Sequence, residues 1–123
     1  MPQITVDYSA SLSDAFDRRT FALSLHELTA RIVSTPLDTC KTRFRRVEEA
    51  YVADGAPEHA VVHVQLGLLP GRTEAVKAEL SEAVLELLRK ATAPDAAGAT
   101  GLIVHATVDV SELGAAYRKH VGA

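Results

Sequence analysis

The 123-residue sequence contains no tryptophan, and aromatic residues make up only 5% of it. Its one cysteine, Cys40, excludes a disulfide within the chain and a zinc site built from cysteine thiolates. No apolar run approaches the roughly 20 residues that cross a bilayer, and the first residues lack the basic and apolar segments of a secretion signal. These absences predict a cytoplasmic protein with no membrane partner and a core made mostly of aliphatic side chains.

The net charge is also small. The formal net charge of −3 gives no electrostatic reason to expect nucleic acid or an anionic membrane as a partner. Hydrophobic residues amount to 47% and charged residues to 24%, which is typical of a globular protein. The length fits one domain, residues 1–123, and is too short for two ordinary ones.

The first half of the chain is predicted to form a strand, a helix and a second strand. Residues 3–8 alternate between apolar and polar, the period of a strand with one buried face. Apolar residues then recur at helical spacing, from a cap at Ser13 to an end before Pro36. Residues 42–53 predict a second strand, and residues 54–57 a turn.

The second half repeats this order. We expect a strand over residues 60–69, a helix capped by Thr73 and closed by residues 93–98, a strand over residues 102–110 and a short terminal helix over residues 111–117. The two β-α-β units, about residues 2–55 and 60–110, predict an α+β fold in which two helices cover one face of a four-stranded sheet, with parallel pairing within each half. The other face would be polar and either solvated or lining an assembly of subunits; it comprises Gln3, Thr5, Asp7, His63, Gln65, His105 and Thr107.

Proline at position 2 is the first candidate for chemistry. Removal of the initiator methionine would leave a secondary amine at the start of the chain, and a free α-amino group titrates near about 7.7–8.0. Burial or nearby cations lower that value further, which suits a general base. Many chains begin with Met-Pro, so by itself Pro2 does not identify an enzyme.

Two groups of basic residues are the second candidate. Lys41, Arg43 and Arg45 share one face of the second predicted strand, where they form either a carboxylate site or a solvated edge that deters aggregation. Gly71 and Arg72 lie between a strand and a helix N-terminus, a place that favours an anion but is also common in ordinary turns.

Other residues carry weaker signals. His63 and His105 on the polar face could share a metal, but no third ligand is apparent, so histidines held in polar contacts are the better interpretation. Cys40 lacks a recognisable base and is interpreted as a bystander thiol. We therefore predict no metal site.

Several short motifs together resemble those of the tautomerase superfamily, and within it those of the 5-carboxymethyl-2-hydroxymuconate Δ-isomerase family. The resemblance runs over most of the chain and is carried by Met1-Pro2, Val6-Asp7-Tyr8-Ser9, Arg43, Arg46-Val47, Ala53-Asp54-Gly55, Val62-His63-Val64 and Gly71-Arg72.

The resemblance implies the tautomerase fold and an isomerase without a cofactor that assembles as a homotrimer. Pro2 would be the catalytic base that moves a proton and a double bond in an unsaturated keto-diacid. Arg72 and Arg43 would bind the carboxylates of this small substrate, and Lys41 stands where some relatives carry another arginine. Other tautomerase or dehalogenase reactions, and a non-catalytic relative, remain alternatives.

Overall fold

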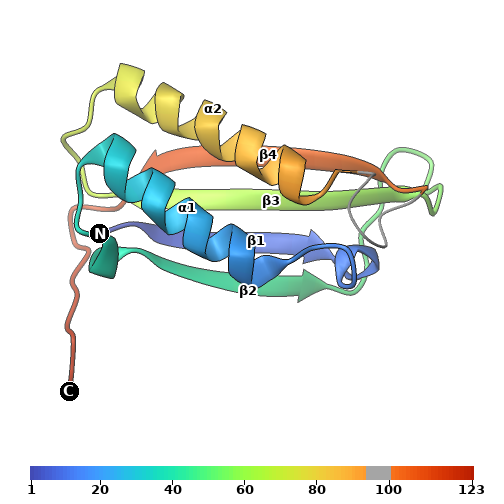
Figure 1. Ribbon diagram of the computed structural model, residues 1–123, viewed down its shortest axis with the longest axis horizontal. Coiled ribbons are helices and arrows are strands. Elements are labelled where there is room, and N and C mark those ends of the chain that lie inside the picture. The colour runs from blue at the N-terminus through green and yellow to red at the C-terminus, as the bar shows by residue number, and fades with distance from the viewer. Residues whose placement is uncertain (94–100) are drawn as a thin grey trace.

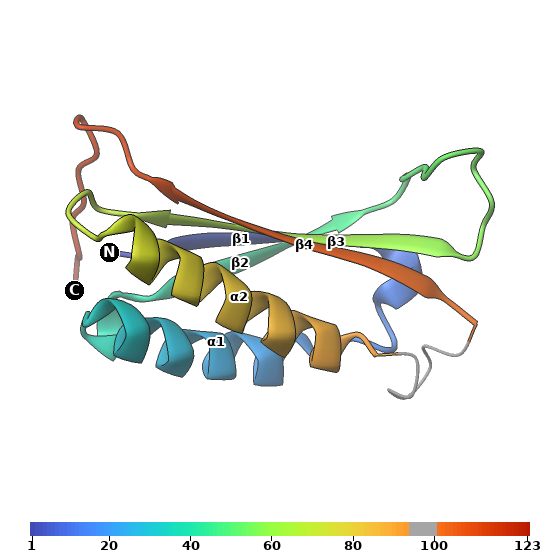
Figure 2. The same cartoon turned by 90° about the horizontal axis from the view of Figure 1, so that it is seen from above.

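The computed structural model describes residues 1–93 and 101–123, and it contains one sheet and two long helices. The strands and helices are β1 (Gln3–Ser9), α1 (Arg18–Val33), β2 (Lys41–Val47), β3 (His59–Leu68), α2 (Glu74–Ala91) and β4 (Ile103–Glu112), with short 3₁₀ helices at Ala10–Leu12 and Leu37–Thr39. Both long helices lie on the same face of the sheet (Figures 1 and 2). The predicted α+β architecture is confirmed.

The strand order is β2-β1-β3-β4. β1 pairs with β2 in parallel, and β3 pairs with β4 in parallel, as the two β-α-β units predicted. The two halves join through an antiparallel pair, β1 with β3, in which Val6 lies opposite Val64.

The hydrophobic core fills the space between the sheet and the helices. Alternate residues of the central strands point into it, and each helix contributes one apolar face. Its fully buried members include Ile4, Val6, Val62, Val64, Leu66, Leu25, Leu80, Val84 and Leu88. The second face of the sheet carries no helix and will be called the open face.

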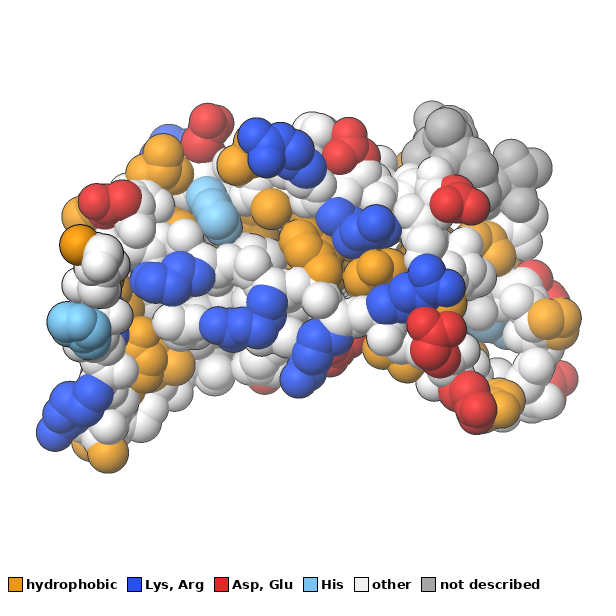
Figure 3. All heavy atoms as spheres, turned by 90° about the horizontal axis from the view of Figure 1, so that it is seen from below, with side chains coloured by type: hydrophobic (Ala, Val, Ile, Leu, Met, Phe, Trp, Pro, Cys, Tyr) orange, Lys and Arg blue, Asp and Glu red, His pale blue; other side chains and the backbone are white. Residues whose placement is uncertain are grey.

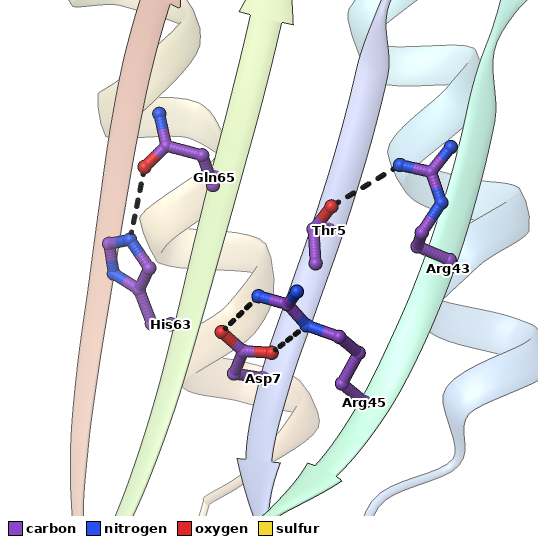
Figure 4. A network of polar contacts seen from close by, with 6 residues as sticks. All are labelled: Thr5, Asp7, Arg43, Arg45, His63 and Gln65. Carbon is purple, nitrogen blue, oxygen red and sulfur yellow. Dashed lines mark hydrogen bonds and ion pairs between the residues drawn. The ribbon is translucent and has the colours of Figure 1, made fainter.

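Polar side chains of the open face bond to one another across the strands (Figure 4). Arg45 donates two hydrogen bonds to the carboxylate of Asp7, at 2.6 and 3.0 Å. His63 contacts the Thr107 hydroxyl at 2.6 Å and the side chain of Gln65 at 3.3 Å. The predicted polar face is therefore confirmed, and each of the seven predicted residues has a hydrogen-bond partner within the chain.

The first helix begins later than predicted. Its N-cap is Asp17, whose carboxylate accepts the backbone N–H and the hydroxyl of Thr20. The predicted cap, Ser13, instead ends a 3₁₀ turn, and its hydroxyl is buried without a partner among the described residues. Asp17 is therefore a strong N-cap, because its two carboxylate oxygens accept two hydrogen bonds from Thr20 in the first turn of the helix.

Two other segments differ from prediction. The second strand stops at Val47 because its partner β1 ends at Ser9, the residue opposite, so Tyr51 beyond it lies exposed. The prediction of a terminal helix over residues 111–117 is wrong: Ser111 continues β4 and pairs with Gly67, and the residues that follow form turns and irregular structure. In both cases the length of the neighbouring strand decides where the element ends.

The N-cap at Thr73 is confirmed: its hydroxyl accepts the N–H of Val76 at 3.2 Å. The segment expected to close α2 lies mostly in residues 94–100, outside the described residues. Within the described part of the chain, no helix combines the length and hydrophobicity needed to cross a membrane.

Candidate active site

The start of the chain is held at one end of the sheet. Pro2 is buried and continues the alternation of buried residues that Ile4 and Val6 follow, so it lies toward the helix-covered face. Its carbonyl oxygen accepts the backbone N–H of Lys41 at 3.3 Å. The parallel pairing of β1 with β2 therefore fixes the position of the amino terminus.

The amino terminus lies in an environment that disfavours its protonated form. The pKa of the terminal amine is lowered first by burial and then by the positive charges of Arg72, Lys41 and Lys119, in that order, while Cys40 acts weakly in the opposite sense. Both causes favour the neutral amine, because neither a low dielectric nor a neighbouring cation tolerates a further positive charge. A neutral amine near neutral pH is able to accept a proton.

Arg72 is half-buried and precedes α2 by two residues. Nη2 and Nε donate to the backbone carbonyl of Val33 at 3.1 and 3.4 Å, and Nη1 donates to the carbonyl of Leu69 at 3.5 Å. Val33 is the last residue of α1, so the guanidinium stands at the negative end of that helix. These bonds use three of its five N–H donors and leave two to hold a ligand.

Lys41 and Arg43 are placed differently from each other. The Lys41 ammonium donates to the carbonyl of Thr39 at 2.7 Å and acts on the charge of the amino terminus. Arg43 lies on the open face, where it donates to Gln3 at 2.8 Å and to Thr5 at 3.4 Å. The structure thus brings Arg72 and Lys41 to the amino terminus and places Arg43 on the opposite side of the sheet from the buried Pro2 ring.

The edge of the molecule formed by β2 is basic. Lys and Arg side chains gather over its middle when it is viewed from that side (Figure 3). Arg45, which shares a face with Lys41 and Arg43, is paired with Asp7. The uncompensated positive charge of this strand therefore lies toward its first residues, near the amino terminus.

Lys119 was not identified from the sequence. It belongs to the segment after β4, and its ammonium lies 2.8 Å from the thioether sulfur of Met1. No periodicity or motif in the sequence connects residues 118 positions apart, so only the folded chain shows this contact.

The remaining candidates are structural. His63 and His105 each bond to another residue: His63 to Thr107, and His105 to His59, whose ring nitrogen lies 2.9 Å away. Cys40 is buried, which raises the pKa of its thiol, and the thiol donates to the carbonyl of His26 at 3.8 Å. Neither arrangement has the geometry of a metal site or of an activated nucleophile.

Comparison with known proteins gives three informative matches. The profile of the family described as 5-carboxymethyl-2-hydroxymuconate isomerase matches residues 2–118. A solved 5-carboxymethyl-2-hydroxymuconate isomerase from Deinococcus radiodurans R1 is 25% identical and superposes with a TM-score of 0.83 over 98% of this chain and 90% of that one. N1, a member of the cis-3-chloroacrylic acid dehalogenase family, is 22% identical, with a TM-score of 0.72 over 98% and 81% of the two chains.

A more distant match has the same fold. A macrophage migration inhibitory factor-like protein from Entamoeba histolytica is 13% identical and superposes with a TM-score of 0.62 over 91% of this chain and 88% of that one. At such identities the likeness concerns the fold alone. No curated protein sequence matches the chain.

Proposed function

Because the chain belongs to the 5-carboxymethyl-2-hydroxymuconate isomerase family, and is thus an isomerase with the tautomerase fold, we propose that it shifts a double bond in a muconate-type acid. Pro2 is the general base in this proposal, once Met1 has been removed. The ring nitrogen takes a proton from a carbon of the keto acid, or from the hydroxyl group of its dienol form, a 2-hydroxymuconate, and the resulting ammonium returns it to another carbon. No atom is lost or gained overall, and no cofactor is needed.

The position of the amino terminus is the observation that supports the proposal. Burial, and then the positive charges of Arg72 and Lys41, lower the pKa of the terminal amine of Met1. Removal of Met1 would transfer the amine to Pro2, whose ring is buried and whose carbonyl is bonded to the backbone of β2. A base with a lowered pKa, held rigidly next to cations, is what proton transfer near neutral pH requires.

The cations have a second task in the reaction. Loss of a proton next to a carbonyl builds negative charge on the carbonyl oxygen, and fixed positive groups stabilise that charge without reorganising. Arg72 is fixed by its bonds to Val33 and Leu69. Lys41 is fixed by its bond to Thr39. They are therefore suited to bind the carboxylates of the substrate and the enolate oxygen.

We also propose that the chain assembles as a homotrimer. The open face is polar and many of its side chains bond to one another, so it is able to line a wet interior. β2 and β4 are edge strands, and the outer side of each pairs with no strand among the described residues. Arg43 would then line the interior rather than contact the base of its own subunit. Light scattering measures the mass directly, and a monomer at micromolar concentration contradicts this assembly.

The proposed base is tested by blocking its nitrogen. Insertion of one alanine between Met1 and Pro2 leaves Pro2 in a peptide bond, and we expect turnover of 5-carboxymethyl-2-hydroxymuconate to fall by about 10²–10⁴-fold. Pro2→Ala, which leaves a primary amine, should retain part of the activity. Pro57→Ala, at an exposed turn, is the matched control.

Intact mass must first show that Met1 is absent from the active protein. The rate should fall as pH drops through the pKa of the amine, because the protonated base is inactive. Full activity in the insertion variant, or in protein that retains Met1, contradicts the role of Pro2.

A further inference from the structure

The chain after β4 turns back over the open face of the sheet. The backbone N–H of Leu113 donates to the carbonyl of Leu68 at 2.7 Å. The Leu113 side chain rests on Gly67, where a β-carbon would lie only 2.7 Å from Cδ2 of Leu113. Gly67 pairs with Gln3 at the start of β1. The absence of a side chain at Gly67 therefore lets the C-terminal segment reach the end of the sheet that holds the amino terminus.

A second contact fixes this segment. The side-chain amide of Gln3 donates to the hydroxyl of Tyr117 at 3.0 Å, while the amide oxygen of Gln3 accepts from Arg43 at 2.8 Å. Leu113 and Tyr117 thus hold the segment at two points against β1 and β3. Lys119 follows two residues later, and both chain ends lie at the same end of the molecule (Figures 1 and 2).

The partner of Lys119 in this arrangement is a poor one. Among the described residues, its ammonium has one contact of hydrogen-bond length, with the sulfur of Met1 at 2.8 Å. A thioether is a weak acceptor, whereas an ammonium bonds best to an anionic oxygen. Removal of Met1 would take this contact away and leave a cation beside the new amino terminus.

We propose that Lys119 binds a carboxylate of the substrate, so that the C-terminal segment forms one wall of the active site. This inference rests on the proposed function. Muconate has two carboxylates and a carboxymethyl group adds a third, so the compound in the family's description carries three. Arg72, Lys41 and Lys119 supply three cations from three separate parts of the chain, and all three act on the terminal amine.

The test compares Lys119→Met and Lys119→Arg with Lys90→Met, an exposed lysine of α2 that lies near Glu86. Mature protein is titrated calorimetrically with propane-1,2,3-tricarboxylate and with glutarate, and kinetics are measured with 5-carboxymethyl-2-hydroxymuconate. We expect Lys119→Met to weaken tricarboxylate binding and raise KM by about 10-fold, with kcat and glutarate binding nearly unchanged, because the lost contact stabilises the bound substrate and transition state equally. Lys119→Arg should restore both, and Lys90→Met should match the parent.

Each result separates the inference from the function on which it rests. If the parent isomerises its substrate and Lys119→Met has the parent's KM, Lys119 is not a binding residue and the inference is wrong. A parent without isomerase activity whose tricarboxylate binding still depends on Lys119 contradicts the proposed function and supports the inference. A fall in kcat with KM and binding unchanged assigns Lys119 to another step and overturns the inference.

Discussion

Replacement of Arg72 should lower both the stability of the protein and its catalytic rate, and two different substitutions should separate these effects. The guanidinium caps the C-terminus of α1, through the carbonyl of Val33, and its charge lowers the pKa of the terminal amine. Arg72→Met removes the cap and the charge while keeping the unbranched apolar stem. Arg72→Lys keeps the charge but loses the planar fork that reaches Val33 and Leu69 together.

The size of the stability effect follows from the contacts. Only the bond from Nη2 to Val33 is short, at 3.1 Å, while the bonds of 3.4 and 3.5 Å contribute little. One hydrogen bond to a charged group contributes about 1.5–3 kcal/mol, and a cation at the negative end of a helix adds up to about 1 kcal/mol. Since Arg72 is only half-buried, we expect Arg72→Met to cost about 2 kcal/mol, a fall of roughly 8 °C in the unfolding midpoint for a chain of this size.

The catalytic effect should be larger than the effect on stability. Loss of a fixed cation from a developing oxyanion lowers kcat by about 10²–10³-fold. Because Arg72 lowers the pKa of the amine, Arg72→Met should raise that pKa, and the acid limb of the rate profile should move to higher pH. Arg72→Lys should restore the position of that limb more fully than it restores the unfolding midpoint.

Thermal unfolding at equal protein concentration and pH–rate profiles measure these two effects. Arg89→Met is the control: its bonds to Glu86, at 2.7 and 2.9 Å, are shorter than those of Arg72, but the pair is exposed and its loss should leave the midpoint within about 2 °C. A midpoint of Arg72→Met equal to the parent's would refute the capping role. An acid limb that does not move would refute the electrostatic role.

Two further predictions concern residues outside the proposed catalytic group. Asp7→Asn removes the exposed pair with Arg45 and should lower the unfolding midpoint by only about 1–2 °C at pH 7. Arg45 holds the pKa of Asp7 below its usual 3.8, so the difference in midpoint between parent and variant should persist above pH 3.8 and vanish as pH falls through the lowered pKa. A difference at pH 2 equal to that at pH 7 contradicts a stabilising role for this ion pair. Cys40→Ala should keep kcat/KM within about two-fold. In the parent protein, burial raises the pKa of the Cys40 thiol, so the thiol should react with a disulfide reagent far more slowly in folded than in urea-unfolded protein. Rapid reaction of the folded protein contradicts this prediction.

Hydrophobic periodicity predicted the layers of the fold well, because alternate residues such as Ile4 and Val6 have no other way to be buried. It failed where the end of an element depends on a neighbour. Nothing near Tyr51 or Ser111 in the sequence shows that β1 stops at Ser9, or that β3 continues far enough to pair with residue 111. Strand length in a sheet is a property of pairs of strands.

The site residues were predictable only where a local sequence feature marks them. Pro2 and Arg72 are marked by local features, a chain start and a glycine turn before a helix, and the structure brings both to one end of the sheet. Arg43 shares a face with Lys41 but lies further along β2, where it bonds to Gln3 and Thr5, whereas Lys41 lies opposite Gln3 at the start of both strands. No motif or periodicity near Lys119 predicts its position, because the C-terminal segment is placed by the packing of Leu113 on Gly67, which is distant in sequence.

The proximity of the two chain ends has a practical consequence for making the recombinant protein. An affinity tag fused ahead of Met1 would keep the proposed base acylated, and one fused after Ala123 would be separated from Lys119 by only four residues and would crowd the proposed site. A cleavable leader whose removal exposes proline as the first residue avoids both problems. Fluorophores and surface attachments belong instead in the loop around Gly55, at the far end of the sheet (Figure 1).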